Sequence, residues 1–311
     1  MAKRVDLRWL AAPNLSAAHA TYVIATGAPC TDEKTVQLLV GSVTDINNRL
    51  VTASIEMGTF WNEYFSGVLA DCEMSVACSQ ALLAAGCSEM QVEQTTLSIT
   101  RRLRDAEQAF QKKFPKLNDQ LDLRARPLRD RWGTVGPGLL REVERQIWDS
   151  SPPKNWWVSG VKTLMVQPIR GGDGGFSLDH STLWMEAMLT DADPAVPEVL
   201  RIIWLLTRMA IDQHTSGKAD EQNLGLPWSL ASVPIVLTAG VELELIRGEL
   251  PIRRAMELWQ FGDAALSNVL QRWWNAHVAD PTPLPVALKL LQKEIQADQD
   301  SADQRSVSEL L

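Results

Sequence analysis

Residues 31–64 read TDEKTVQLLVGSVTDINNRLVTASIEMGTFWNEY, and this stretch indicates the fold most clearly. Asp32 and Glu33 come at its start, where an N-cap and an acidic first turn suit the positive end of a helix. Apolar residues then recur every three or four positions, which predicts one helical stripe. Gly58 and Gly67 are the candidate breaks in it. The stripe comprises Val36, Leu39, Val43, Ile46, Leu50, Ala53, Met57, Phe60 and Tyr64.

The apolar surface of this segment is wider than a coiled-coil seam. Leu38, Val40, Val51, Ile55 and Trp61 lie outside the stripe and are apolar as well. A two-stranded coiled coil keeps most of those positions charged, so the pattern favours the central helix of a bundle.

Further helices are predicted on the C-terminal side of this segment. A small-residue helix ends at Gly86, and Ser88 with Gln91 forms a capping-box pattern for the next one. Gly133–Gly138 and the Pro-containing segment 150–155 are predicted to interrupt helical structure. We therefore expect an N-terminal helical bundle over 1–132, a Gly/Pro-rich joint with a short helix over 133–160, and a C-terminal domain over 161–311. One continuous domain is the alternative.

The segment 161–178 lacks the helical spacing of apolar residues that its surroundings show. Two short runs with β-forming residues flank the glycine-rich stretch 171–175, which predicts a small β-hairpin or a mobile flap. Helical spacing resumes over Thr182–Leu189 and in five later segments, and residues from Gln296 onward are expected to form a disordered acidic tail. The predicted class is mainly α, with a C-terminal helical region that carries the hairpin.

Composition narrows the classes of function. The chain has 311 residues, of which 45% are hydrophobic, and its net charge of −8 argues against a general nucleic-acid binder. The N-terminus lacks the apolar core of a signal peptide, and the longest apolar stretch is too short to span a bilayer. The four cysteines show no CxxC spacing. These features predict a soluble, cytoplasmic protein.

Familiar catalytic signatures are absent from the sequence. It contains no HExxH, GxGxxG, GxxxxGK[ST] or GxSxG motif. The content of apolar residues and of tryptophan is high, with 12 Trp in the chain. The first hypothesis is therefore a helical interaction or assembly subunit without catalytic activity or cofactor, which binds a protein partner or a second copy of itself.

The alternative hypothesis is an enzyme that binds a metal or a small ligand. Asp179 and His180 follow the glycine-rich flap and precede a predicted helix, whose N-terminus would favour an anion. His214 ends a later helix. If those two helices pack antiparallel, His180 and His214 could share a divalent metal or act in acid–base chemistry, with Asp179 supporting the first histidine.

Two further groups are candidates for contact with a ligand or partner. Trp156 and Trp157 stand in a Pro-bounded loop, and exposed indoles there would predict a contact site. The segment 101–131 contains ten basic and five acidic residues, and it begins with Arg101, Arg102 and Arg104. That segment is either a solvated helix surface or a docking surface for an acidic partner.

Overall fold

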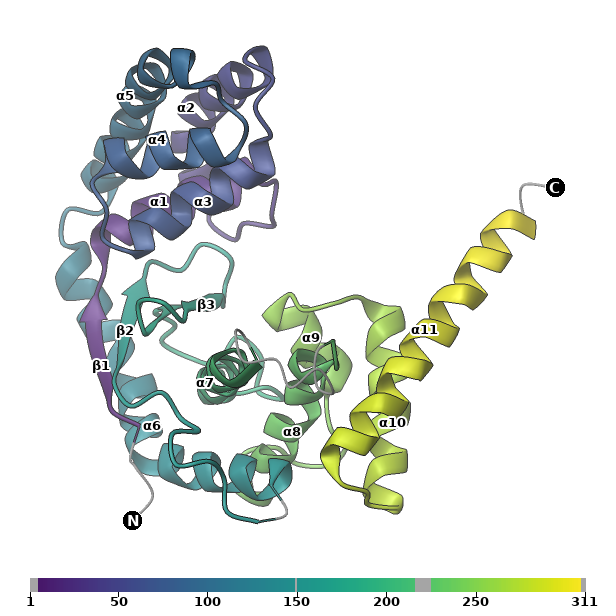
Figure 1. The fold of residues 1–311 in the computed structure, drawn as a ribbon. Helices are drawn as coiled ribbons and strands as arrows, with labels where there is room; N and C mark the ends of the chain where they lie inside the picture. Colours follow the sequence, from purple (N-terminus) through teal and green to yellow (C-terminus); the bar gives the residue numbers. More distant parts are fainter. Residues whose placement is uncertain (1–4, 149, 216–224, 309–311) are drawn as a thin grey trace. The chain divides into compact units, whose positions relative to one another are not determined.

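The computed structural model describes residues 5–148, 150–215 and 225–308, with side chains described up to residue 300. This part of the chain forms eleven helices and four short strands, which confirms the mainly α class (Figure 1). The chain divides into two compact units. Unit one comprises Met1–Asp6, Leu128–Gly160 and Thr190–Leu311, and unit two comprises Leu7–Pro127 and Val161–Leu189. The strands near 161–178 thus belong with the N-terminal helices, unlike the linear division expected.

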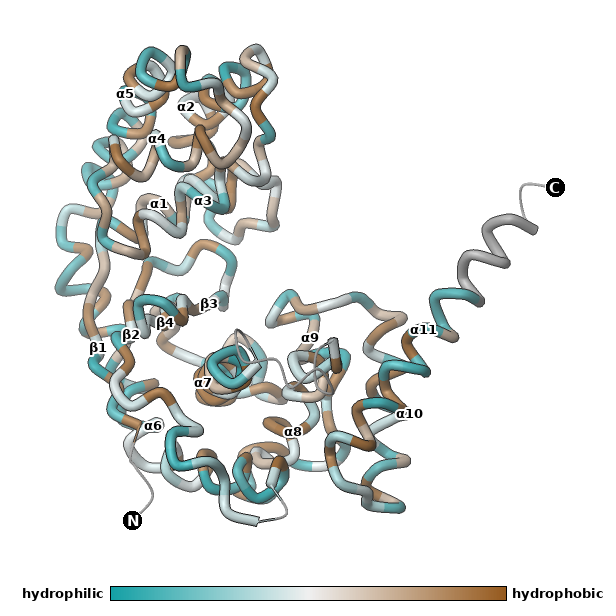
Figure 2. The backbone as a smooth tube through the Cα atoms, viewed as in Figure 1, coloured by the Kyte–Doolittle hydropathy of each residue, from teal (hydrophilic) through white to brown (hydrophobic). Residues whose placement is uncertain are grey.

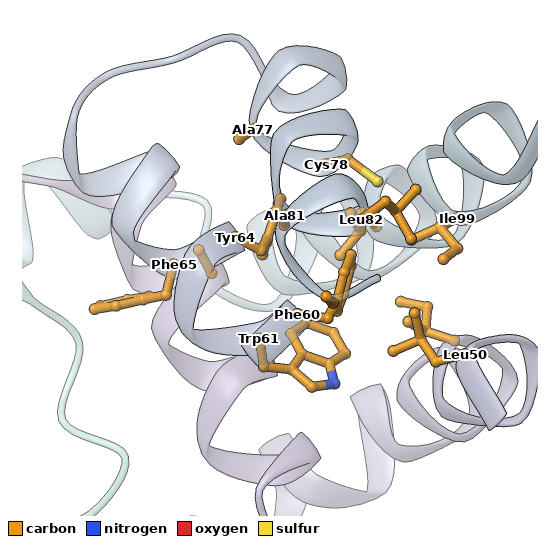
Figure 3. Close-up of a cluster of buried hydrophobic side chains, with 14 of the residues drawn as sticks. Leu50, Phe60, Trp61, Tyr64, Phe65, Ala77, Cys78, Ala81, Leu82 and Ile99 are labelled. Carbon is orange, nitrogen blue, oxygen red and sulfur yellow. The ribbon is translucent and has the colours of Figure 1, made fainter. Parts of the chain in front are cut away.

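Five whole helices of unit two share one core. They are α1 (Pro13–Ala25), α2 (Glu33–Thr52), α3 (Met57–Leu69), α4 (Met74–Ala84) and α5 (Glu89–Lys113). Helix α1 contacts α2, α3 and α5, while α4 contacts α3 and α5. Figure 3 shows the aromatic centre of this core, where Phe60 and Trp61 of α3 meet Leu50 of α2 and Leu82 of α4.

The long stripe at 36–64 is divided between two helices. The N-cap prediction is confirmed, because the Asp32 carboxylate accepts the backbone N–H of Thr35. The break falls at Ala53–Glu56 rather than at Gly58, since Ser54 adopts a left-handed conformation (φ 57°). The Glu56 side chain then caps α3 by accepting the N–H groups of Gly58 and Thr59. Apolar spacing continues through this turn, so periodicity alone does not reveal it.

The four strands form one mixed sheet in place of the predicted hairpin. They are β1 (Leu7–Ala11), β2 (Val161–Val166), β3 (Gly174–Ser177) and β4 (Thr182–Glu186), in the order β1-β2-β4-β3. The β1–β2 and β2–β4 pairs are parallel, whereas β3 and β4 are antiparallel. The helix predicted over Thr182–Leu189 is wrong, because parallel pairing with β2 makes this apolar segment a buried strand.

The predicted interruption at Gly133–Gly138 lies inside a continuous helix, α6 (Leu117–Ile147). Leu139, Leu140 and Val143 just beyond it are buried, and their packing offsets the low helix propensity of the glycines. Gly136 also makes room for an indole, since a Cβ there would stand 2.7 Å from the Trp132 ring.

Unit one holds the remaining helices. They are α7 (Glu198–Thr215), α8 (Trp228–Glu242), α9 (Ile252–Trp259), α10 (Ala264–Ala279) and α11 (Leu284–Ser308), close to the predicted segments. In Figure 2 the tubes of α10 and α11 alternate between teal and brown, as amphipathic helices do. Helix α11 continues to Ser308, so the predicted disorder from Gln296 is wrong for residues 296–308; residues 309–311 lie outside the described part.

Most tryptophans of the C-terminal helices are buried. Trp204 stacks on Trp259 at 4.7 Å between ring centroids, and Trp273 and Trp274 pack between α10 and its neighbours. A buried ion pair between Arg201 and Glu198 lies beside them, and Arg201 also donates to the carbonyl of Leu258. Among the described residues, no helix combines the length and apolar character needed to cross a bilayer.

Candidate functional site

The register of the sheet in unit two brings basic side chains together. Arg8 of β1 is paired with Lys162 of β2, and Lys162 is paired with Thr182 of β4. Paired residues in adjacent strands project from the same face of a sheet. Three strands thus contribute one polar row, and the next row on this face contains Leu10 and Leu164.

This polar row borders a cavity of about 870 Å³ that lies wholly within unit two. We call it the sheet–helix cavity. Its sheet side is formed by Arg8, Lys162, Thr182 and by His180, which precedes β4. Its helix side is formed by residues of α1, of α3, of the α3–α4 turn and of α5. The acidic lining residues are Asp71, Glu73 and Glu107, and the other polar ones on that side include Tyr64 and Thr21.

The basic lining residues are available to a ligand. Arg8, Lys162 and His180 are all exposed, and none of them forms an ion pair with another described residue. Since strand pairing holds the backbones of Arg8 and Lys162 side by side, two positive charges are kept close together without a counter-ion. Such a pair attracts a carboxylate or phosphate group.

The acidic side of the cavity is partly desolvated. Glu107 is half-buried, and burial raises the pKa of its carboxyl although the charge of Arg104 acts in the opposite direction. Burial likewise raises the pKa of the neighbouring Tyr64 hydroxyl, with the charges of Cys78 and Glu107 adding to the effect. A positively charged group placed here would stabilise the ionised form of Glu107.

The N-terminus of α1 opens into the same cavity. Ala12, Pro13 and Asn14 line it, and Ala12 at the N-cap provides no side-chain hydrogen bond. The hydroxyl of Ser16 donates to the carbonyl of Ala12 and accepts the backbone N–H of Gln167. The partial positive charge of this helix end therefore adds to that of the basic row.

A buried ionic cluster fixes the sheet against α1. His19 of α1 and Glu186 of β4 have side chains with 0% exposure, and Nε2 of His19 donates to Oε1 of Glu186 at 3.1 Å. The same carboxylate accepts the backbone N–H groups of Ile169, Arg170 and Gly172 at 2.6–2.7 Å. The glycine-rich connection is thus wrapped around an anion that belongs to the protein itself.

Glycine is required where this connection turns. Gly171 and Gly172 have φ angles of 83° and 121°, which side-chain-bearing residues rarely adopt. The predicted flap is therefore a turn between β2 and β3 that three hydrogen bonds hold to Glu186, rather than the tip of a hairpin.

The two acids in this cluster have opposite pKa shifts. Burial by itself would raise the pKa of Glu186, but the hydrogen bond and charge of His19 and the N–H groups of Arg170 and Gly172 bring that pKa below its usual value. The pKa of Asp173 is raised, chiefly by burial, despite the opposing charges of His19 and Arg170. Glu186 is therefore held ionised, as its backbone ligands require.

Asp179 and His180 lie in the turn between β3 and β4. The helix whose N-terminus they were expected to precede is strand β4, so the anion-binding argument made for that helix is wrong. The structure gives His180 a different setting, because its side chain lines the sheet–helix cavity. Asp179 is exposed and does not line that cavity.

His214 belongs to unit one and packs on one of the predicted contact residues. Its ring stacks on Trp156 with 5.3 Å between centroids, and its Nε2 lies 3.1 Å from the carbonyl oxygen of Asn155. Shared metal binding by His180 and His214 stays a prediction. Within residues 5–148, 150–215 and 225–308, no group of three or more His, Cys, Asp or Glu side chains is arranged to hold a metal ion.

The tryptophan pair was a candidate contact site on the condition that its indoles are exposed. Trp156 and Trp157 are both buried, and Nε1 of Trp157 donates to Glu144 at 2.6 Å. The hydrogen bond to Glu144 holds their loop against α6, so that condition is not met, and contact of this pair with a ligand or partner stays a prediction. Arg101 and Arg104 are exposed on α5, whereas Arg102 pairs with Asp45 of α2, and partner binding by these arginines stays a prediction.

Sequence reasoning missed Arg8, Lys162, His19 and Glu186. One local signal was present, because Glu186 interrupts the apolar run of Leu183–Met188 with a single charge. A lone acid in such a run is paired when buried. The pairing of Arg8 with Lys162 depends on strands more than 150 positions apart, and no local pattern reports it.

Comparison with known proteins gives no assignment, because no family model, no curated protein and no solved structure matches the chain.

Proposed function

We propose that unit two binds a small zwitterionic molecule in the sheet–helix cavity. The observation that carries this proposal is the segregation of charge in the lining, with Arg8, Lys162 and His180 on the sheet side and Asp71, Glu73 and Glu107 on the helix side. A volume of about 870 Å³ is within the range of small-molecule sites. A ligand with an anionic and a cationic end would neutralise both sides at once.

The proposal is tested with three forms of one peptide, measured by isothermal titration calorimetry. Unblocked triglycine carries both charges, N-acetyl-triglycine only the negative one, and triglycine amide only the positive one. We expect the unblocked form to bind at least about tenfold more tightly than either blocked form, which corresponds to about 1.4 kcal/mol. Equal binding of the N-acetyl form would replace the proposal with a simple anion site.

Matched variants test which side of the cavity binds the anionic end of the ligand and which side binds the cationic end. Arg8→Ala with Lys162→Ala removes the basic row, and Glu107→Gln removes an acid without changing its shape. The double variant should weaken binding of the unblocked and N-acetyl forms, while Glu107→Gln should weaken binding of the unblocked and amide forms. Arg253→Ala, on an exposed surface of unit one, is the control. Unchanged affinity in both cavity variants would contradict this site.

An interaction or assembly role is the second candidate, as the sequence predicts. It is favoured by large apolar side chains that are exposed on two neighbouring helices, namely Val76 and Leu83 of α4 and Met90 and Leu97 of α5. Exposed apolar side chains gathered in one place are typical of protein contact surfaces. Sedimentation velocity over a range of concentrations tests whether the chain associates with itself.

A further inference from the structure

The exposed face of α5 is complementary in charge to the same face of a second α5 helix that runs antiparallel to it. Glu93, Leu97 and Arg101 are spaced four residues apart, so they follow one another along this face. All three are exposed, and Leu97 is 69% exposed although it is a large apolar residue. Neither Glu93 nor Arg101 forms an ion pair with another described residue.

A shallow groove of about 350 Å³ lies beside Leu97, between α4 and α5. Its walls include Val76, Val92, Glu93 and Thr96, and Leu97 itself forms part of the rim. Met90, which is 97% exposed, lies one helical turn beyond Glu93 on the same face of α5. Figure 1 shows α4 and α5 next to each other within the helices of unit two.

We infer that a second copy of this chain docks on this face, with the two α5 helices antiparallel about a two-fold axis at Leu97. In that arrangement Glu93 of each copy lies opposite Arg101 of the other, because the two residues are equally far from Leu97. Each Leu97 enters the groove of its partner, and each Met90 lies over the aliphatic part of the opposing Arg104. A two-fold interface requires this kind of self-complementary surface.

Charge complementarity identifies the occupant as a second copy rather than an unrelated helix. A symmetric pair forms the Glu93–Arg101 contact twice with no additional residue, and the uncompensated charges of one copy are the partners that the other needs. This inference uses a different surface from the sheet–helix cavity and does not depend on a ligand there.

The test is a charge exchange in the full chain, measured by analytical ultracentrifugation between 1 and 100 µM, taken as roughly the range of a modest interface. Glu93→Arg and Arg101→Glu each place like charges opposite one another and should weaken dimerisation at least about tenfold. The double variant E93R/R101E should recover it. An equimolar mixture of the two single variants should form a heterodimer, since each position 93 then again faces a position 101 of opposite charge.

Two further variants separate this face from other modes of association. Leu97→Glu should abolish the dimer, whereas Leu123→Glu, at an exposed position of α6, should leave it unchanged. Circular dichroism checks that each variant keeps its helical content. A wild-type chain that stays monomeric at 100 µM, roughly the upper end of that range, would overturn the inference. A dimer that is insensitive to Leu97→Glu, or that neither the double variant nor the mixture restores, would overturn it as well.

Discussion

Glu186 shows how one residue can join a strand, a helix and a loop. Its carboxylate binds His19 and three backbone N–H groups while excluded from water. Removing one partner of a buried charged cluster is costly, because the others lose a ligand that water does not replace.

The first prediction concerns Glu186→Gln. We expect this change to lower the free energy of unfolding at pH 7 by about 3 kcal/mol. The folded-state pKa of Glu186 is lowered, so its contribution is present above the pKa of an ordinary glutamate and is lost as pH falls through the lower folded value. The difference between wild type and variant should therefore shrink below about pH 4.

Urea denaturation at several pH values measures this difference. Glu63→Gln, at an exposed position of α3, is the matched control and should change little at any pH. Asp173 acts with the opposite sign, because its pKa is raised, chiefly by burial and in part by the charge of Glu186 that the variant removes. A difference that stays constant from pH 7 to pH 3 would show that Glu186 does not stabilise the fold through its charge.

At the scale of elements, the ends of helices could be predicted from the sequence, whereas strands defined by long-range pairing could not. The start of α2 at Asp32 and the stop of α4 at Gly86 were predictable, because a cap acts within a few residues. Strand β4 lies where the sequence predicts a helix, since apolar residues recur with helical spacing there and Leu183–Met188 carries no alternation of apolar and polar residues. A strand buried on both faces lacks that alternation, and its neighbour β2 is the reason that it is a strand.

Close packing of α3 on α4 supplies the second prediction. A Cβ at Gly67 would stand 2.8 Å from the Cβ of Ala77, so Gly67→Ala should lower the free energy of unfolding by about 1–3 kcal/mol. Ala77→Gly in the same chain should recover part of that loss. Gly41→Ala, at an exposed position of α2 with open space around it, should instead raise stability by about 0.5–1 kcal/mol.

Urea denaturation midpoints of the wild type, Gly67→Ala, Gly67→Ala with Ala77→Gly, and Gly41→Ala test this prediction. If Gly67→Ala leaves the midpoint unchanged or raises it, α3 and α4 are not in the close contact described. Failure of Ala77→Gly to recover any stability would contradict the specific Gly67–Ala77 approach.

At the scale of the whole molecule, each compact unit is built from segments that are not consecutive in the sequence. Unit two takes β1, five whole helices and the first part of α6 from Leu7–Pro127, and its other three strands from Val161–Leu189. The sequence predicts a boundary near residue 132, because the Gly and Pro residues of Gly133–Gly138 disfavour regular structure. It did not show that the chain returns to complete the first unit, since parallel pairing of β1 with β2 joins segments about 150 residues apart.

The third prediction follows from that grouping. A fragment of residues 1–127 lacks β2, β4 and Glu186, so His19 and β1 lose their partners. We expect this fragment to keep helical circular dichroism but to unfold with a broader and less cooperative thermal transition than unit two within the full chain. Adding a peptide of residues 161–189 should sharpen the transition. A fragment that melts sharply by itself would support the linear division instead.

Occupation of the sheet–helix cavity is the central claim, and Cys72 reports on it directly. Cys72 is half-buried and lines the cavity, whereas Cys30 is half-buried in the same unit and does not line it. Iodoacetamide alkylation of both thiols is followed by mass spectrometry with and without saturating unblocked triglycine. A bound ligand should slow the reaction of Cys72 at least about tenfold, as expected when a site is filled nine-tenths of the time or more, while leaving Cys30 unchanged. Equal rates at Cys72 with and without the peptide, under conditions where calorimetry shows binding, would place the ligand elsewhere and contradict the account.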